Sequence, residues 1–286
     1  MAEETNLTGM LDYVKQTARR AGDILREAYD RPRNITYKGE VDLVTETDLT
    51  VEAFIISALQ ERYPDIGVLA EEGGEVGEVS EMRWLIDPLD GTNSFAHGIP
   101  IFCVSIGLRG PDGPVLGVIY DPLRDECFSA LRGQGAWLND RPCRVSSVPR
   151  LGEAMLATGF PYERRTIIDN NSAAAAMFLR RAQGIRRLGS AALDMAYVAC
   201  GRFDGLWEWG VKPWDIGAGL LLVKEAGGRL TNYAGRPVDD LRQNRQNVVA
   251  SNGLIHDEML AVLAQIYEFT DDGDFILKNE YRLPGM

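Results

Sequence analysis

The spacing of apolar side chains predicts two long helices at the start of the chain. Apolar residues recur every three or four positions between Asn6 and Tyr29, which is the period of a helix with one buried face. The same period predicts a second helix from Asp48 to Tyr63. Pro64 ends this helix, because proline disfavours the helical conformation in the residue before it.

Shorter apolar runs, separated by Gly, Pro and Asp, follow these helices and predict strands. The predicted strands are Ile66–Leu69, Arg83–Ile86, Phe102–Leu108, Val115–Tyr120 and Glu126–Leu131. Several of them are only a turn apart, which favours antiparallel neighbours within one sheet.

Beyond Pro149, strands and helices alternate. The predicted strands are Ala154–Thr158, Ile185–Leu188, Gly205–Trp209, Arg229–Thr231 and Val248–Ser251, and the predicted helices are Ala173–Ala182, Ala191–Cys200, Ile216–Ala226 and His256–Tyr267. The two patterns predict a mixed α+β and α/β architecture with a strand-rich lobe (residues 1–145), an alternating lobe (146–270) and a tail (271–286). No linker rich in Gly, Ser or Pro separates the lobes, so we expect one catalytic unit.

Composition narrows the range of functions. The 30 basic and 42 acidic residues give a formal net charge of -12, which disfavours a nucleic-acid partner. The four cysteines form no C-x-x-C pair, so we expect reduced thiols and no zinc site. Only two histidines occur, His97 and His256, which excludes a His-rich metal site. Neither a secretory signal nor an apolar run of about 20 residues is visible, so we expect a cytoplasmic protein without membrane contact.

One short segment carries two aspartates on a tight turn. An apolar strand leads into Asp87, and Pro88 ends its ladder because proline lacks an N–H group. Asp90 and the following glycine then turn the chain, and Thr92 is expected to cap the helical turn beyond. Divalent cations prefer oxygen ligands and phosphate prefers the N–H groups at a helix start, so the segment suits both. An Asx-rich surface turn is the alternative.

Acidic residues also stand at the ends of other predicted elements. Glu71 and Glu72 follow a short strand, Asp48 stands at a helix start, and Asp215 precedes a later helix. Taken singly, a Glu pair indicates a solvated loop and each Asp a helix cap. Together, in a chain with so little histidine, they favour a magnesium ion that activates water over a side-chain nucleophile.

These segments resemble the inositol monophosphatase family, in the superfamily that includes the fructose-bisphosphatases. The motifs occur in the family's order and at its spacing over roughly residues 10–265. The matching motifs are Asp42-Leu43-Val44-Thr45-Glu46-Thr47-Asp48, Glu71-Glu72-Gly73, Asp87-Pro88-Leu89-Asp90-Gly91-Thr92, Gly189-Ser190-Ala191-Ala192, Trp214-Asp215-Ile216-Gly217-Ala218-Gly219 and Glu225-Ala226-Gly227-Gly228.

The resemblance implies a layered α-β-α-β-α sandwich, usually a homodimer, and a lithium-sensitive active site with two or three Mg²⁺ ions. Glu71, Asp87 and the backbone carbonyl of Leu89 are implied to hold the first ion. Asp87, Asp90 and Asp215 are implied to hold the second. A weaker third ion is implied nearer Glu71 and solvent.

The resemblance also implies the other roles at the site. Thr92 and Asp48 orient and deprotonate the attacking water, with Glu71 close by. The backbone N–H groups of Gly91 and Thr92 receive the phosphate. Lys38 resembles a basic residue of a mobile active-site loop, and a solvated lysine is the alternative interpretation.

Inositol monophosphate is the expected substrate, because Glu208 matches the family position that accepts a hydrogen bond from inositol hydroxyls. The residues expected to contact substrate are Asp90, Gly91, Thr92, Gly189, Ser190, Ala191, Glu208 and Asp215. Arg186 and Arg187 precede this loop and suit a second phosphate, a solvated surface or a subunit contact, which keeps fructose 1,6-bisphosphate open.

A nucleotide substrate and a regulatory role also stay open. The nucleotide 3′-phosphoadenosine 5′-phosphate is a further candidate substrate. From a different class, the candidate is a non-catalytic regulatory protein associated with RNA or polymerase, which the net charge and the complete acidic set disfavour. Many relatives read D-G-T-T-N-F where this chain has Asn93 and Ser94 after Thr92, and this departure affects contacts behind the metal ligands.

Overall fold

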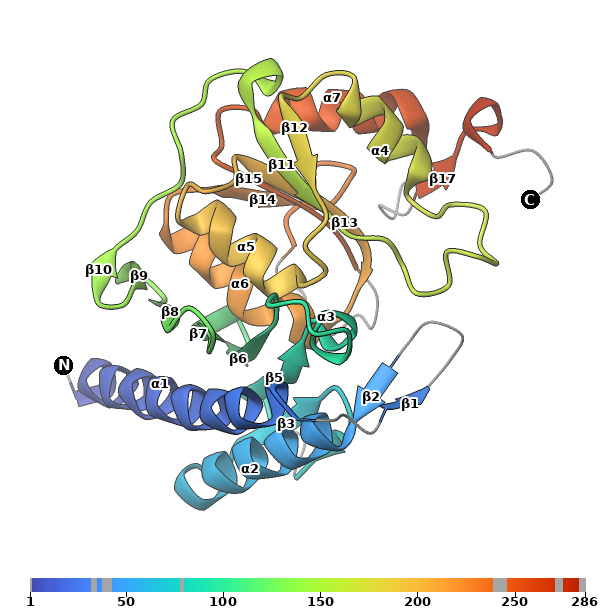
Figure 1. Cartoon of the computed structure of the whole chain (residues 1–286). Helices are drawn as coiled ribbons and strands as arrows, with labels where there is room; N and C mark the ends of the chain where they lie inside the picture. Colours follow the sequence, from blue (N-terminus) through green and yellow to red (C-terminus); the bar gives the residue numbers. More distant parts are fainter. Residues whose placement is uncertain are drawn as a thin grey trace.

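A computed structural model describes residues 2–31, 35–37, 43–77, 80–238, 246–270 and 275–282. Helices and sheets alternate in five layers (Figure 1), as predicted. Helices α1 and α2 form the first layer, an eight-stranded sheet the second, and α5 and α6 the third. A five-stranded sheet and then α4 and α7 complete the α-β-α-β-α sandwich.

The first layer consists of the helices α1 (Ala2–Tyr29) and α2 (Glu46–Arg62). The helical spacing predicted both, but α2 begins two residues earlier than expected because Thr45 caps it. Buried side chains of both helices pack on the eight-stranded sheet, including Val14 and Leu25 of α1 and Ile55 of α2. A two-stranded hairpin, β1 (Ile35–Tyr37) and β2 (Leu43–Thr45), joins the helices.

The eight-stranded sheet has the order β10-β9-β8-β7-β6-β5-β3-β4. Its strands are β3 (Gly67–Ala70), β4 (Gly74–Val76), β5 (Arg83–Asp90), β6 (Cys103–Gly110), β7 (Gly113–Asp121), β8 (Glu126–Leu131), β9 (Gly135–Leu138) and β10 (Arg141–Pro142). Neighbours are antiparallel, as expected, except β3 and β5, which are parallel. The sequence pattern missed β4, β9 and β10 because they are only two to four residues long.

The middle layer consists of α5 (Ala191–Ala199) and α6 (Pro213–Glu225), which lie between the two sheets. Because both faces of α6 are covered, nine of its 13 residues are buried and it lacks a polar stripe. Two glycines allow α6 to approach the sheet closely. A Cβ atom at Gly117 would lie 2.7 Å from the Ala218 carbonyl oxygen, and one at Gly107 would lie 3.0 Å from the Ala218 nitrogen.

The second sheet has the order β12-β11-β13-β15-β14. Its strands are β11 (Met155–Thr158), β12 (Gly184–Arg186), β13 (Gly205–Val211), β14 (Arg229–Thr231) and β15 (Gln246–Ser251). Strand β11 is parallel to both β12 and β13, whereas β15 is antiparallel to β13 and β14. Helices α4 (Ser172–Leu179) and α7 (His256–Ile266) cover its outer face.

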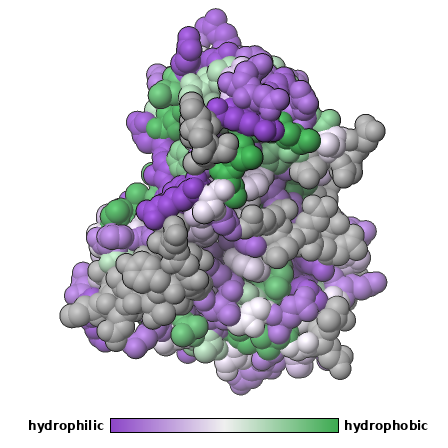
Figure 2. Space-filling view, turned by 90° about the vertical axis from the view of Figure 1, so that its right-hand side faces the viewer, coloured by the Kyte–Doolittle hydropathy of each residue, from purple (hydrophilic) through white to green (hydrophobic). Residues whose placement is uncertain are grey.

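Short elements complete the described part of the chain. They are α3 (Thr92–Ala96), the 3₁₀ turns Leu151–Glu153 and Asn279–Tyr281, and the hairpin of β16 (Tyr267–Phe269) and β17 (Phe275–Leu277). Hydrophilic side chains predominate on the face shown in Figure 2, and hydrophobic ones form separate patches. Within the described residues, every helix is too short or too polar to cross a bilayer.

Candidate active site

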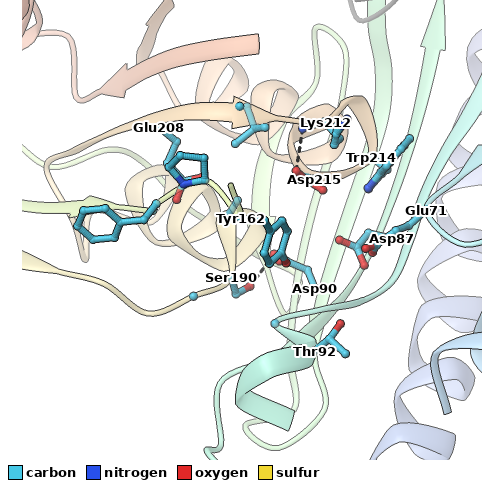
Figure 3. A pocket seen from close by; sticks show the side chains of 18 of the residues that line it. Glu71, Asp87, Asp90, Thr92, Tyr162, Ser190, Glu208, Lys212, Trp214 and Asp215 are labelled. Carbon is cyan, nitrogen blue, oxygen red and sulfur yellow. Dashed lines mark hydrogen bonds between the residues drawn. The ribbon is translucent and has the colours of Figure 1, made fainter. Parts of the chain in front are cut away.

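Carboxylates from different elements line one cavity of about 350 Å³ between the two sheets. Glu71 follows β3, Asp87 and Asp90 lie on β5, and Asp215 lies in the first turn of α6. Figure 3 shows these four side chains around the same space. The structure therefore brings together all four acidic residues that the sequence predicted as metal ligands.

Strand β5 does not end at Pro88, and the prediction that this proline stops the ladder is wrong. Pairing with β6 is regular as far as Asp87 and resumes at Asp90, with a register shift between them. The irregularity accommodates a residue without an N–H group and turns both aspartates toward the cavity. The Leu89 nitrogen donates to Asp87 Oδ1 at 3.0 Å, which fixes that carboxylate.

Gly91, not Thr92, is the N-cap residue of α3. Gly91 has φ 99°, and a Cβ atom there would lie 2.8 Å from the Ile101 carbonyl oxygen, so this tight turn requires glycine. The Thr92 hydroxyl instead has two acceptors within reach of its one proton, the Leu89 carbonyl oxygen at 2.9 Å and Asp48 Oδ1 at 3.0 Å. The first N–H groups of α3 have no partner within the helix and suit an anion.

Asp48 is buried behind Thr92 at the third position of α2, so the alternative prediction that it is an N-cap is wrong. Thr45 is the N-cap, and its nitrogen and hydroxyl both donate to Asp48 Oδ2. Burial raises the pKa of Asp48 against these hydrogen bonds, which lower it. The other oxygen accepts from Thr92, so Asp48 connects to the cavity through that hydroxyl.

Hydrogen bonds from the start of α5 fix the side chain of Asp90, which lies on β5. The Ser190 hydroxyl and the Ala192 nitrogen each donate to Asp90 Oδ2 at 2.7 Å. Ser190 is also the N-cap, because its oxygen accepts from the Leu193 nitrogen at 3.2 Å. Gly189, predicted with Ser190 to contact substrate, lines the same cavity. Ser190 therefore also has a role the sequence did not predict, since it orients a proposed metal ligand.

Asp215 stands at the third position of α6, where Oδ2 accepts from the Lys212 nitrogen at 2.7 Å. Burial raises the pKa of Asp215 and of Asp87 well above the ordinary range, and the nearby carboxylates raise both further. Burial also raises the pKa of Asp90 to about 6. A bound cation would relieve the repulsion among these carboxylates.

The donor set fits magnesium, which prefers oxygen ligands. Four carboxylates and the Leu89 carbonyl face one cavity, so these residues would hold the ion. Within the described residues no three acidic, His or Cys side chains already form a closed cation cage.

Glu208 lines the side of the cavity that faces the second sheet and is almost fully buried. Burial and, to a smaller extent, Asp90 raise its pKa to about 8, although Arg187 acts to lower it. Arg187 lines the cavity as well, whereas Arg186 is exposed at the end of β12 and does not. Lys38 lies outside the described residues.

Sequence reasoning missed two groups at the site. Glu52 is buried on α2 and accepts from the Glu72 and Gly73 nitrogens at 2.9 and 2.7 Å, which fixes the turn that carries Glu71. A buried glutamate on an apolar helix face is the signal that could have found it. The second group lines the cavity from the β11–α4 connection and includes Tyr162. No pattern of charged residues in the sequence marks this second group.

Behind the metal-ligand segment, Ser94 is buried and Asn93 is half-buried in α3. Neither lines the cavity. The departure at these two positions therefore leaves the cavity lining unchanged.

A five-layer sandwich with acidic side chains and a helix start around one cavity between its sheets defines a metal-dependent phosphatase. The profile of the inositol monophosphatase family matches residues 6–268. The chain belongs to that family, whose members are metal-dependent phosphatases.

Known relatives carry different names. An inositol-1-monophosphatase of Synechocystis is 44% identical over 262 residues, which cover 91% of this chain and 90% of the relative. The Nus factor SuhB of Escherichia coli is 40% identical over 88% of this chain and 94% of the relative. The solved inositol monophosphatase of Anabaena superposes with a TM-score of 0.83 at 43% identity, covering 91% of this chain and 97% of that structure.

Proposed function

We propose that this protein is a magnesium-dependent phosphomonoesterase that hydrolyses an inositol monophosphate to inositol and phosphate. The observation that carries the proposal is the convergence of Glu71, Asp87, Asp90 and Asp215 on one cavity beside the start of α3. Two or three ions at this site would leave room for a small phosphate ester between the carboxylates and Glu208.

The chain's own groups account for binding and proton transfer. Bound Mg²⁺ would supply neutralisation of the phosphate dianion and a lower pKa for the attacking water. The N–H groups of Gly91 and Thr92 receive the phosphate oxygens at the start of α3. The attacking water gives its proton to the Thr92 hydroxyl as that hydroxyl gives its own to Asp48.

Glu208 supports an inositol ester over the other candidates, because a buried carboxyl at the far side of the cavity suits a polyol hydroxyl. Arg187 keeps fructose 1,6-bisphosphate as a second candidate, since its guanidinium lines the same cavity. The nucleotide 3′-phosphoadenosine 5′-phosphate completes the set of esters to compare.

The name Nus factor SuhB on several relatives does not describe a hydrolase and keeps the regulatory alternative open. The acidic cavity supports catalysis instead. A binding protein has no physical reason to keep four mutually repelling carboxylates in one cavity.

The test is phosphate release from the three esters, with and without magnesium. The wild type should release phosphate from inositol 1-phosphate fastest and only with magnesium. Asp90→Asn should lose at least about a thousandfold in kcat, because it replaces a charged proposed metal ligand with a neutral amide. Asp112→Asn, on the exposed β6–β7 turn, is the matched control and should match the wild type.

The remaining outcomes each have a definite meaning. Preference for another ester would retain the metal chemistry and replace the substrate. Unchanged turnover in Asp90→Asn would refute the proposed metal ligands. No release by folded wild-type protein with magnesium would favour the regulatory alternative.

A further inference from the structure

Asn171 makes side-chain contacts that are unusual for its place at the start of a helix. It is the N-cap residue of α4, but its backbone is left-handed, with φ 69°, and among the described residues its side chain caps none of the helix N–H groups. An N-cap residue ordinarily has an extended backbone and accepts a hydrogen bond from the helix with its side chain. Asn171 is instead 1% exposed, and its amide turns toward the ends of β11 and β13.

Both hydrogens of the Asn171 amide bond to the end of β11. The side-chain nitrogen donates to the Gly159 carbonyl oxygen at 2.6 Å and to Thr158 Oγ1 at 2.9 Å. The side-chain oxygen accepts from the Trp207 indole nitrogen at 2.8 Å, and the Thr158 hydroxyl donates to the Trp207 carbonyl oxygen at 2.7 Å. Asn171 therefore ties the chain beyond β11 to β13. Because Asn171, Thr158 and Trp207 are buried, loss of the amide would leave polar groups unsatisfied.

The backbone that Asn171 holds lies directly against the carboxyl group of Glu208. A Cβ atom at Gly159 would lie 2.3 Å from Glu208 Oε1 and 2.8 Å from its Cδ, so the carboxyl occupies the space that glycine leaves. Both residues line the cavity, and Figure 3 shows Glu208 across it from Asp87. Successive side chains of a strand point to opposite faces. Asn171 thus holds β13 by Trp207 on one face, while Glu208 points into the cavity from the other.

We infer that Asn171 is a positioning residue that holds Gly159 against Glu208 and so keeps this carboxyl in place for a hydroxyl of the substrate. The inference rests on the proposed function, in which Glu208 contacts a polyol. A flexible side chain loses rotamer freedom when it binds a ligand, and a neighbour that fixes it beforehand lowers this cost. Asn171 itself is not among the described residues that line the cavity, so it acts on the substrate through Gly159 and Glu208.

The first experiment compares inositol 1-phosphate with phenyl phosphate, whose leaving group carries no further hydroxyl for Glu208, at saturating magnesium. Asn171→Gly removes the amide and suits the left-handed backbone. It should raise KM for inositol 1-phosphate about tenfold with little change in kcat, because the carboxyl is no longer pre-organised. It should leave kcat/KM for phenyl phosphate within about twofold of wild type. Equal losses on both esters, or no loss on either, would overturn the inference.

A double variant shows whether Asn171 acts through Glu208. Because Glu208→Ala already removes the carboxyl, adding Asn171→Gly to it should raise KM for inositol 1-phosphate less than about twofold further. A further rise as large as in the single variant would contradict the inference. Asn171→Asp keeps the acceptor for the Trp207 indole but removes the donor to Gly159, so it should raise KM as Asn171→Gly does. A wild-type KM for Asn171→Asp would also count against the inference.

Asn139→Gly is the matched control, because Asn139 is another left-handed asparagine with a bonded side chain. It has φ 47°, accepts from the Cys127 nitrogen at 2.9 Å and donates to the Asp125 carbonyl oxygen at 2.8 Å. It follows β9 and lies outside the described cavity lining. Asn139→Gly should leave both esters unchanged even if its thermal midpoint falls. A raised KM for inositol 1-phosphate in this control would attribute the effect of Asn171→Gly to lost stability and refute the positioning role.

Crystal structures separate this inference from the proposed function. In Asn171→Gly the Glu208 carboxyl should leave its contact with Gly159, while the aspartates of the cavity keep their positions. If wild-type protein releases no phosphate from inositol 1-phosphate, the proposed function fails, and a displaced Glu208 in the variant still supports the positioning role. A Glu208 carboxyl that stays against Gly159 in the variant refutes that role, whichever ester the protein hydrolyses.

Discussion

His256 is buried, whereas His97, the other histidine, is exposed. Both ring nitrogens of His256 have a hydroxyl partner: Thr231 Oγ1 lies 2.9 Å from Nε2, and Ser251 Oγ lies 2.8 Å from Nδ1. Burial and, to a smaller extent, Arg229 lower the pKa of His256 to about 4. The folded protein thus holds a neutral imidazole at pH 7.

A pH-dependent loss of stability follows from this histidine. The unfolded chain binds the proton more tightly, so the contribution of His256 is complete above about pH 6.5 and falls as the pH drops toward about 4. Between pH 7 and pH 5 the loss in the free energy of unfolding should be about 2 kcal/mol. Urea titrations of wild type and His256→Gln at both pH values measure it.

The difference between the two proteins isolates the histidine, because the carboxylates titrate in both. His97→Gln should show the same pH dependence as wild type. If His256→Gln also loses stability to the wild-type extent between pH 7 and pH 5, the neutral imidazole does not contribute.

Among single residues of the candidate site, the sequence predicted those that belong to recognisable motifs and missed those that only the packing of the chain brings to the site. Asp87, Asp90 and Asp215 were predicted as members of one site because short motifs hold them at element ends. Glu52 was missed because it acts through hydrogen bonds to residues distant in sequence, and Tyr162 because only the folded path of its connection brings it to the cavity.

Helix α6 packs against strands β6 and β7 at backbone distance. At Gly117 a Cβ atom would meet the Ala218 carbonyl oxygen at 2.7 Å and its Cα at 2.9 Å. Backbone atoms of a helix between two sheets cannot move aside as a flexible side chain can. The approach of α6 to this sheet therefore depends on glycine.

Gly117→Ala should destabilise the protein by about 1–3 kcal/mol, as overpacking does in a filled core. Gly9→Ala is the matched control, because Gly9 lies in α1 with nothing within 4 Å of the added Cβ atom. It should stabilise by about 0.5–1 kcal/mol, the difference in helix propensity. Thermal midpoints of both variants show whether Gly117→Ala lowers the stability and Gly9→Ala raises it. A Gly117→Ala protein that is as stable as wild type would contradict the packing argument.

Most elements of six residues or more were predicted from periodicity, because an apolar stripe or run suffices to define them. The end of β5 was not, since a bulge at Pro88 depends on the register with β6. The N-cap of α3 was misplaced by one residue because the turn geometry that selects Gly91 comes from contact with Ile101.

In the whole molecule, the cavity gathers carboxylates whose repulsion a bound cation would relieve. Burial raises the pKa values of Asp87 on β5 and Asp215 on α6, and Glu71 and Asp90 raise both further. Because a ligand that binds only the folded state stabilises it by mass action, magnesium at a hundredfold excess over its Kd should add about 3 kcal/mol. Thermal midpoints with magnesium and with EDTA measure this.

Asp87→Asn provides the control for this prediction. It removes one repelling charge and one proposed ligand, so the variant should be more stable than wild type in EDTA and gain much less from magnesium. An equal magnesium shift in both proteins would place the cation elsewhere.

The layered fold of the whole molecule was predicted because the resemblance to the family implied it, whereas the pattern of elements alone indicated only two lobes.

The residues that form the site are synthesised far apart in time, because they are far apart in the sequence. Glu71, Asp87 and Asp90 belong to the first sheet, but Ser190 fixes Asp90 and Asp215 arrives with α6, more than 120 positions after Asp90. A growing chain thus exposes an incomplete acidic half-site until α6 has emerged and docked between the sheets. Hydrolysis at the proposed site would therefore be closed to the nascent protein until Asp215 is in place.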